Sequence, residues 1–171
     1  TNYVVMSSCV STQIPHAVGV ALAMKIAGDH GRCAFGYMGD GGTSEGDFHV
    51  ALNFAGVMNA PAVLICQNNQ WAISVPIAQQ SASETIAIKA KAYGMPGVRV
   101  DGNDALAVWA VTRAAAERED LEHADDQEER GAQQRGDEDR RPQLLGPRGV
   151  VLVEGRDDPA EARLDGARVL A

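Results

Sequence analysis

The sequence is poor in the residues that mark several classes of protein. It has 171 residues, 5% of them aromatic, and three cysteines that form no CxxC pair. We therefore expect Cys9, Cys33 and Cys66 to be free, buried thiols in a reducing compartment, not parts of a disulfide framework or a zinc site. No apolar run approaches the roughly 18 residues of a membrane span, and no signal peptide is visible. These absences favour the cytoplasm, or an organelle matrix in a eukaryote, and no contact with a membrane.

An excess of positive charge is also absent. The formal net charge is -8, which argues against a nucleic-acid partner. Residues 1–116 hold seven acidic and six basic side chains, whereas residues 117–171 hold sixteen acidic and nine basic ones. Trp109 is the last aromatic residue and Lys91 is the last lysine. The last third of the chain therefore differs in kind from the rest, because it lacks the side chains needed to bury much apolar surface.

Residues 1–117 alternate between helical and strand patterns. Pro15 near its start and Gly28 just past its end frame the first helix, and Ser44 and Asp47 have capping-box spacing at the second. Trp109, at helical spacing from apolar neighbours, is expected in the core. The expected helices are Gln13–Ala27, Ser44–Asn59, Thr85–Tyr93 and Ala105–Glu117, and the expected strands are Cys33–Met38, Ala62–Cys66 and Val98–Val100.

The strands are apolar runs separated by helices. This pattern predicts an α/β fold in three layers, a parallel sheet with helices on both faces. In such sheets ligands bind at the carboxyl ends of the strands. Two segments rich in Gly or Asn lie there, one after Met38 and one after Gln67.

The first of these segments is GDGGTSEGD, residues 39–47. Asp40 offers a hard oxygen ligand at a strand end. Gly41 and Gly42 let the backbone approach a ligand closely and leave N–H groups to face a phosphate. The following helix adds its positive dipole end. A plain turn uses the same residues, so this loop alone does not decide between the two readings.

The second segment is QNNQWAIS, residues 67–74. Between Gly41 and Asn68 lie 26 residues, which is one helix and one strand, so the two loops should be neighbours at one edge of the sheet. An Asp carboxylate and an Asn carboxamide that converge there form an all-oxygen site. Such a site suits Mg²⁺, which completes its shell with phosphate oxygens and water. The two segments together favour a ligand that carries a diphosphate.

The spaced pair, GDGG followed after 26 residues by NN, resembles the thiamine diphosphate fingerprint. Residues 48–74, FHVALNFAGVMNAPAVLICQNNQWAIS, resemble the α subunits of 2-oxo acid dehydrogenase E1 components. The resemblance covers nearly all of residues 1–117. It implies the thiamine diphosphate-binding fold, with thiamine diphosphate and Mg²⁺ as cofactors. Residues 7–15, SSCVSTQIP, resemble the branched-chain members most closely.

The resemblance also implies roles for individual residues. Asp40, the Asn69 side chain and the main-chain carbonyl of Trp71 would bind Mg²⁺. The other cofactor-binding residues would be Gly39, Gly41 and Gly42, the last two at the diphosphate, Ile73 against the cofactor, and Ser8 and Val10 against the aminopyrimidine ring. Gln67 stands where some relatives carry an arginine beside the phosphates. That departure either weakens diphosphate binding or is compensated by another cation.

A second cation is implied near the start of the chain. In the branched-chain relatives Ser7, Thr12, Gln13 and the carbonyl of Cys9 would surround a structural potassium ion. The alternative is that Thr12 and Gln13 only cap the helix that follows them.

The chemistry implied by the resemblance is shared between chains. Thiamine diphosphate supplies the carbon nucleophile and electron sink for decarboxylation of a 2-oxo acid, and the protein binds and orients it. The glutamate that activates the pyrimidine comes from a separate E1 β subunit, so no catalytic residue is assigned here. We expect an α2β2 heterotetramer that passes the acyl group to the lipoyl domain of E2, and little activity from this chain alone.

The family pattern stops after Glu117. The strand and the His-bearing active-site loop that should follow are not recognisable, and Val150–Val153 is one short strand candidate. We expect residues 1–117 to be a thiamine diphosphate-binding domain truncated at both ends. We expect residues 118–171 to be an irregular or disordered tail read from a shifted frame. The alternative is a genuine acidic extension.

Three functions stay open on the sequence. The first is the E1 α subunit of a thiamine diphosphate-dependent dehydrogenase of branched-chain 2-oxo acids. The second is the same subunit for pyruvate or acetoin, because the segment QSASETIA also resembles pyruvate enzymes. The third is an inactive remnant that only binds its β partner.

Overall fold

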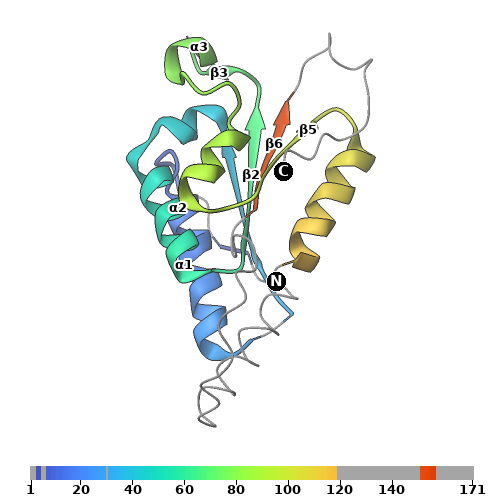
Figure 1. The fold of residues 1–171 in the computed structure, drawn as a ribbon. Helices are drawn as coiled ribbons and strands as arrows, with labels where there is room; N and C mark the ends of the chain where they lie inside the picture. Colours follow the sequence, from blue (N-terminus) through green and yellow to red (C-terminus); the bar gives the residue numbers. More distant parts are fainter. Residues whose placement is uncertain (1–2, 5–6, 30, 119–150, 157–171) are drawn as a thin grey trace.

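The structure is a computed structural model that describes residues 3–4, 7–29, 31–118 and 151–156. Its centre is a sheet of four parallel strands in the order β1-β2-β6-β5 (Figure 1). The strands are β1 (Ala34–Gly39), β2 (Ala62–Asn68), β5 (Gly97–Asp101) and β6 (Val151–Arg156). The parallel α/β arrangement predicted from the apolar runs is confirmed.

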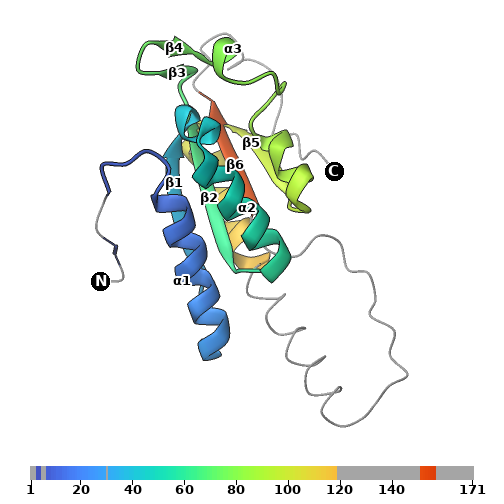
Figure 2. The same ribbon diagram turned by 90° about the vertical axis from the view of Figure 1, so that its left-hand side faces the viewer.

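One face of the sheet is covered by α1 (Gln13–Ala27), α2 (Gly46–Met58) and the 3-10 helix η2 (Ala87–Tyr93). Helices α1 and α2 lie side by side across β1 and β2 (Figure 2). The main core forms beneath them and includes the fully buried side chains of Ile14, Phe48, Leu52 and Leu64. Helix α1 ends where the sequence predicts, because Gly28 adopts the left-handed conformation (φ 70°) of a helix C-cap.

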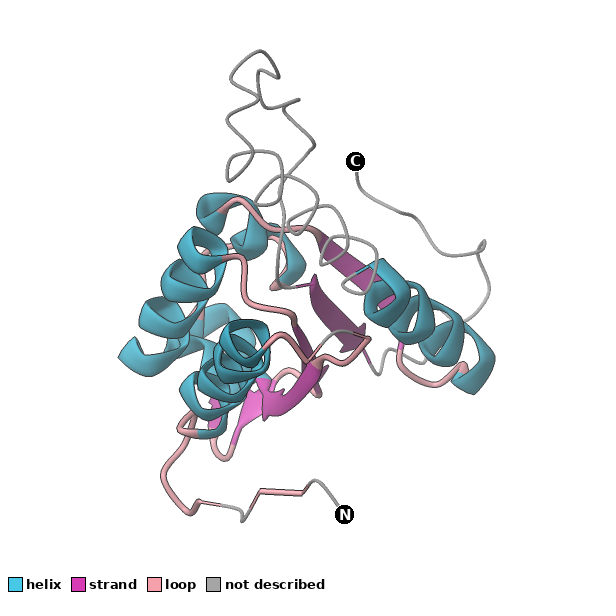
Figure 3. Cartoon of the chain, turned by 90° about the horizontal axis from the view of Figure 1, so that it is seen from below, coloured by secondary structure: helices cyan, strands magenta, loops and turns pink. Residues whose placement is uncertain are grey.

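The other face is covered by the helix of residues 105–118, so helices lie on both sides of the sheet (Figure 3). A smaller core forms there, from Val63, Ile65, Val100 and Ala115. The expectation that Trp109 belongs to the core is wrong. Its side chain is 60% exposed and stacks under the guanidinium of Arg113, 5.3 Å from the ring centre.

The two paired strands β1 and β2 are buried differently. Strand β2 is buried on both faces, as its continuous apolar run predicts, whereas burial alternates along β1. Phe35 and Tyr37 of β1 are 41% and 56% exposed, and they line a groove of about 600 Å³ against Trp109 and the rest of that helix. The apolar run of β1 did not reveal this exposed face. The helix of residues 105–118 packs over the neighbouring strands, not over β1.

Strand β6 lies within residues 117–171, the acidic part of the chain that has no aromatic residue. It pairs in parallel with β2 on one side and with β5 on the other, so it is an interior strand. The strand expected at Val150–Val153 is therefore present, but it begins one residue later, at Val151, and ends three residues later, at Arg156. The remainder of the proposed tail, residues 119–150 and 157–171, lies outside the described residues, and its shifted-frame origin stays a prediction.

Three local expectations need correction. The capping box at Ser44 does not form, because residues 40–44 make a separate 3-10 helix and α2 begins at Gly46, with no side-chain cap. The helix expected at Thr85–Tyr93 is the 3-10 helix η2. Of the three thiols expected to be buried, only Cys66 is; Cys9 is exposed and Cys33 is half-buried.

Between β2 and η2 the chain forms a small excursion beyond the sheet. It consists of a two-stranded hairpin, β3 (Trp71–Ala72) and β4 (Val75–Pro76), followed by the single turn α3 (Ile77–Gln80). Each helix in the described ranges is too short or too polar to cross a membrane.

Candidate functional site

Asp40 lies at the carboxyl end of β1 and opens the 3-10 helix η1 (Asp40–Ser44). Its side chain is 1% exposed. Oδ2 accepts a hydrogen bond from Nε2 of Gln80, at 3.3 Å. Among the described residues no other side chain donates to this carboxylate. A buried carboxylate is costly unless it is paired, so the position favours a cation beside it.

The backbone of η1 is held by one of its own side chains and by two from other parts of the fold. The hydroxyl of Thr43 donates to the carbonyl of Asp40, at 2.8 Å. Nζ of Lys89, on η2, donates to the hydroxyl and the carbonyl of Thr43, at 3.0 and 3.2 Å. The buried hydroxyl of Ser11 donates to the carbonyl of Gly42. The loop is therefore fixed in place by the protein itself.

Gly41 and Gly42 have no room for a side chain. A Cβ atom on Gly41 would lie 2.6 Å from Cβ of Ala72, and one on Gly42 would lie 2.9 Å from Oγ of Ser11. Cβ atoms essentially never approach other atoms so closely, so both positions require glycine. The close approach also brings η1 directly against the β3 strand.

The second loop follows β2 at the same edge of the sheet. The register pairs Gly39 with Gln67, so Asp40 and Asn68 come next on adjacent strands. Asn68 is 6% exposed, and its Oδ1 accepts from the N–H of Gln70, at 3.0 Å. Asn69 is exposed, and its Oδ1 accepts from the N–H of Trp71, at 2.9 Å. These side-chain turns bend the chain away from the sheet.

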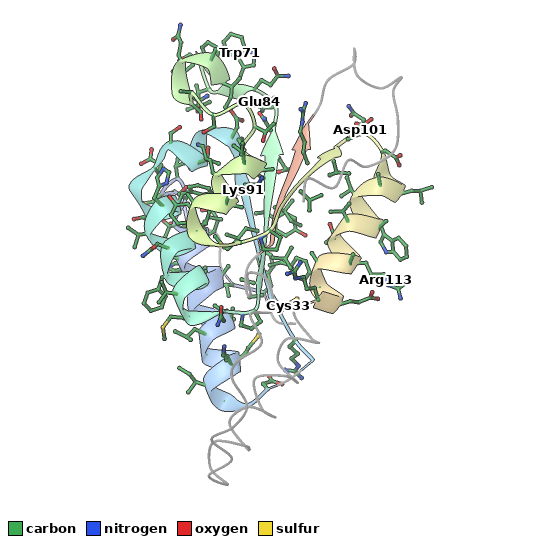
Figure 4. All side chains as sticks on the ribbon, viewed as in Figure 1. Cys33, Trp71, Glu84, Lys91, Asp101 and Arg113 are labelled. Carbon is green, nitrogen blue, oxygen red and sulfur yellow. The ribbon has the colours of Figure 1, made fainter. Side chains whose placement is uncertain are left out.

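The hairpin presents Trp71 beyond the carboxyl ends of the strands (Figure 4). Trp71 pairs with Pro76, which has no N–H group. The adjacent pair, Gln70 and Ile77, is hydrogen-bonded, with the N–H of Ile77 donating to the carbonyl of Gln70 at 2.8 Å. Bonded and non-bonded pairs alternate in antiparallel strands, so the Trp71 carbonyl points away from β4. It is thus not engaged by its strand partner. That is the group expected to bind a cation.

Ile73 lies at the tip of the hairpin. It is 100% exposed and left-handed (φ 56°), an uncommon conformation for a β-branched residue. Trp71 is 54% exposed. Exposure of the apolar side chains of Trp71 and Ile73 to water is unfavourable, so the tip is suited to contact with a further apolar group.

The residues at this edge fit Mg²⁺ and a diphosphate. The candidate metal ligands are all oxygen atoms: those of one buried carboxylate, of Asn amides and of a main-chain carbonyl. No group of three His, Cys, Asp or Glu side chains gathers anywhere in the described ranges, so a cation here would draw on those amide and carbonyl oxygens beside Asp40. Oε1 of Gln80 is also buried there without a hydrogen-bond partner. Bound at this edge, thiamine diphosphate would supply the carbanion chemistry, and these residues would hold its diphosphate end.

The other expected site residues lie near the two loops but are less engaged. Gly39 is exposed and a Cβ there would meet nothing. Ser8 and Val10 are exposed, immediately before Ser11, the residue that contacts Gly42. Gln67 lines the groove that Phe35 and Tyr37 form with the helix of residues 105–118, not the edge that carries the two loops.

The expected potassium ligands form one turn before α1. The N–H of Cys9 donates to Oγ of Ser7, at 3.2 Å, and the Cys9 carbonyl accepts from the N–H of Thr12, at 3.4 Å. Thr12 is the N-cap of α1, but its side chain makes no capping hydrogen bond. The alternative in which the Thr12 side chain caps the helix is therefore wrong. Gln13 is the first residue of α1.

Sequence reasoning missed Ser11, Lys89 and Gln80. The only hint in the sequence for Ser11 is its place between Val10 and Thr12, two residues to which the resemblance gives a role. Its left-handed conformation (φ 69°) is visible only in the structure. Lys89 and Gln80 carry none, because their roles depend on how η2 and α3 fold back over η1.

The chain matches the family described as "Dehydrogenase E1 component" over residues 1–125. It belongs to that family. Members of this family depend in general on thiamine diphosphate, in agreement with the oxygen-rich edge formed by η1 and the loop after β2.

Three relatives illustrate the likeness. The chain is 53% identical over 116 residues to the 2-oxoisovalerate dehydrogenase subunit alpha 1, mitochondrial, of Arabidopsis thaliana, which is 68% of this chain and 24% of the relative. It is 54% identical over 113 residues to the 3-methyl-2-oxobutanoate dehydrogenase subunit alpha of Mycobacterium tuberculosis, 66% of this chain and 30% of the relative. It is 50% identical over 109 residues to the pyruvate dehydrogenase E1 component subunit alpha of Bacillus cereus, 64% of this chain and 29% of the relative. The match thus spans less than a third of each relative's length.

Proposed function

We propose that this chain is the cofactor-holding part of an E1 α subunit and binds thiamine diphosphate through Mg²⁺. Asp40, Asn69 and the carbonyl of Trp71 are the protein ligands of the cation, and Gly41 and Gly42 lie against the diphosphate. The observation that carries the proposal is the buried carboxylate of Asp40, which opens a glycine loop beside the Asn-rich end of β2.

The reaction proposed for the assembled enzyme is oxidative decarboxylation of branched-chain 2-oxo acids. The two relatives named for 2-oxoisovalerate and 3-methyl-2-oxobutanoate support this substrate class. The fold is then the thiamine diphosphate-binding fold, of which the parallel sheet and its two helical layers are a part. Pyruvate is the second candidate, supported by the pyruvate dehydrogenase relative at 50% identity.

The chemistry requires a partner. The site holds the diphosphate end of the cofactor, while the E1 β subunit supplies the glutamate that activates the pyrimidine, in an α2β2 heterotetramer that passes its acyl group to the lipoyl domain of E2. We place the enzyme in the cytoplasm of a bacterium or in an organelle matrix. The turn formed by Ser7, Cys9, Thr12 and Gln13 is the proposed potassium site, supported by the uncommitted side chain of Thr12.

The test has two stages. Mg²⁺ and thiamine diphosphate are first titrated into the full chain, with binding followed by calorimetry, and saturable binding that requires both is expected. The chain is then combined with an E1 β subunit, and 2-oxoisovalerate is compared with pyruvate as substrate. Binding without turnover of either acid would identify a remnant that holds cofactor only. Absence of cation-dependent cofactor binding in the first stage would overturn the proposal.

A further inference from the structure

Gln80 is the residue that joins the hairpin excursion to the carboxylate of Asp40. It is the last residue of α3. Its Nε2 donates to Oδ2 of Asp40, at 3.3 Å, and to the carbonyl of Val75, at 2.8 Å. One amide group thus ties β4 to the end of β1.

The orientation of this amide follows from its partners. A carboxylate and a carbonyl can only accept hydrogen bonds, so the NH₂ end of Gln80 must face both of them. Its Oε1 then points elsewhere. This oxygen is buried, has no hydrogen-bond partner, and lies 3.6 Å from the position a Cβ of Gly41 would take.

A buried acceptor without a donor is unfavourable, so Oε1 is placed for a donor that is added later. The neighbours of that position are the glycine loop and Asp40, where the proposed function puts a cation. Mg²⁺ keeps several of its water molecules when it binds to proteins, and each of those waters is a hydrogen-bond donor. Residues that orient the direct ligands of a metal commonly act in this way.

We propose that Gln80 is a positioning residue of the cation site. Its amide N–H group fixes the carboxylate of Asp40, and its Oε1 accepts a hydrogen bond from a water molecule of the bound cation. This inference rests on the proposed function and adds a residue that binds the cation only through Asp40 and water.

The consequence distinguishes between cations. Mg²⁺ requires near-ideal octahedral geometry, whereas Ca²⁺ accepts variable geometry with more ligands. A carboxylate released from Gln80 should therefore lose Mg²⁺ affinity more than Ca²⁺ affinity. A residue that only supported folding would weaken both equally.

The experiment uses the full chain with Trp109→Phe, which leaves Trp71 as the only tryptophan. Trp71 fluorescence is followed while Mg²⁺ or Ca²⁺ is titrated at fixed thiamine diphosphate. Gln80→Met removes the amide at similar size, and Gln79→Met is the matched control at an exposed neighbour. We expect Gln80→Met to lower the Mg²⁺ affinity by roughly 10- to 100-fold and the Ca²⁺ affinity much less. Gln79→Met should match the parent.

The outcomes separate the two proposals. If the parent chain gives no cation-dependent response, the proposed function fails and this inference falls with it. If the parent responds and Gln80→Met keeps the Mg²⁺ affinity of Gln79→Met, or loses Mg²⁺ and Ca²⁺ affinity equally, the inference is overturned while the function stands. Gln80→Leu, compared with Gln79→Leu, serves if Gln80→Met does not fold. It also removes the amide and should lower the Mg²⁺ affinity more than the Ca²⁺ affinity, whereas an equal loss of both would overturn the role.

Discussion

The glycine loop η1 and the hairpin tip lie against each other but are built in different ways. Asp40, Thr43 and Gly42 of η1 are buried, and Ser11, Thr43 and Lys89 bind the loop through hydrogen bonds. In the hairpin, Ile73 at the tip is fully exposed, and both Ile73 and Gln70, which precedes β3, are left-handed. The Asn side chains form local hydrogen bonds there: Oδ1 of Asn68 and of Asn69 accept from the N–H groups of Gln70 and Trp71.

The protein therefore holds η1 with hydrogen bonds from distant residues, whereas the hairpin tip lacks such support from the described residues. The diphosphate end of the proposed site is organised by the protein alone, so its geometry should persist without ligand. The tip places apolar side chains in water, so it depends on a further surface, whether cofactor or partner. Substitutions at Asp40, Gly41, Lys89 and Ile73 test this division.

Asp40→Asn should have the largest effect on binding and little effect on folding. The amide keeps the shape of the side chain but removes the charge, and a cation ligand is lost. We expect cation-dependent binding of thiamine diphosphate to fall by at least about 100-fold by calorimetry, with an unliganded thermal midpoint equal to or above that of the parent. A large drop in that midpoint would show that the carboxylate stabilises the fold without a cation.

Gly41→Ala should disturb both folding and binding. The new Cβ would meet Ala72 at 2.6 Å, and overpacking of this kind costs about 1–3 kcal/mol. Gly39→Ala is the matched control, because a Cβ there meets nothing within 4 Å. Urea unfolding of both variants measures the difference. Equal stability would mean that η1 and β3 separate easily, against the idea of an organised loop.

Lys89→Met should loosen η1 from the side of η2. It removes two hydrogen bonds to Thr43 from a charged donor, which is expected to cost about 1–2 kcal/mol of unfolding free energy. Lys91→Met, an exposed lysine two residues on, should change stability by less than about 0.5 kcal/mol. Amide exchange at Thr43 and Gly42 should quicken in the first variant alone.

Ile73→Asn should act in the opposite direction. Asparagine tolerates the left-handed conformation, and an exposed isoleucine loses no packing, so we expect a gain of up to about 1 kcal/mol in unliganded stability. Cofactor binding should weaken, because an apolar contact is lost. Thermal unfolding with and without Mg²⁺ and thiamine diphosphate checks both signs. A loss of unliganded stability would show that the tip is packed.

These contrasts also explain what the sequence could predict. Helix α1 and the strands β1, β2 and β5 follow from apolar periodicity and from Pro15 and Gly28, which are local signals. Asp40 and the Asn pair follow from their spacing. The anchoring by Lys89 and Gln80 could not be predicted, because it depends on contacts across some 40 residues or more. The exposed face of β1 was missed for the same reason, since its cover depends on where one distant helix packs.

The interior position of β6 bears on the order in which the sheet forms during synthesis. Strands β1 and β2 can pair once residue 68 has been made, but β5 has no neighbour in the sheet until β6 begins at Val151, 50 residues after Asp101. At translation rates of about 5–20 residues per second, the edge of β5 waits roughly 3–10 s for that strand and the edge of β2 roughly 4–17 s. Unpaired strand edges invite association with other chains, so the nascent protein passes through an interval in which it is most prone to aggregate.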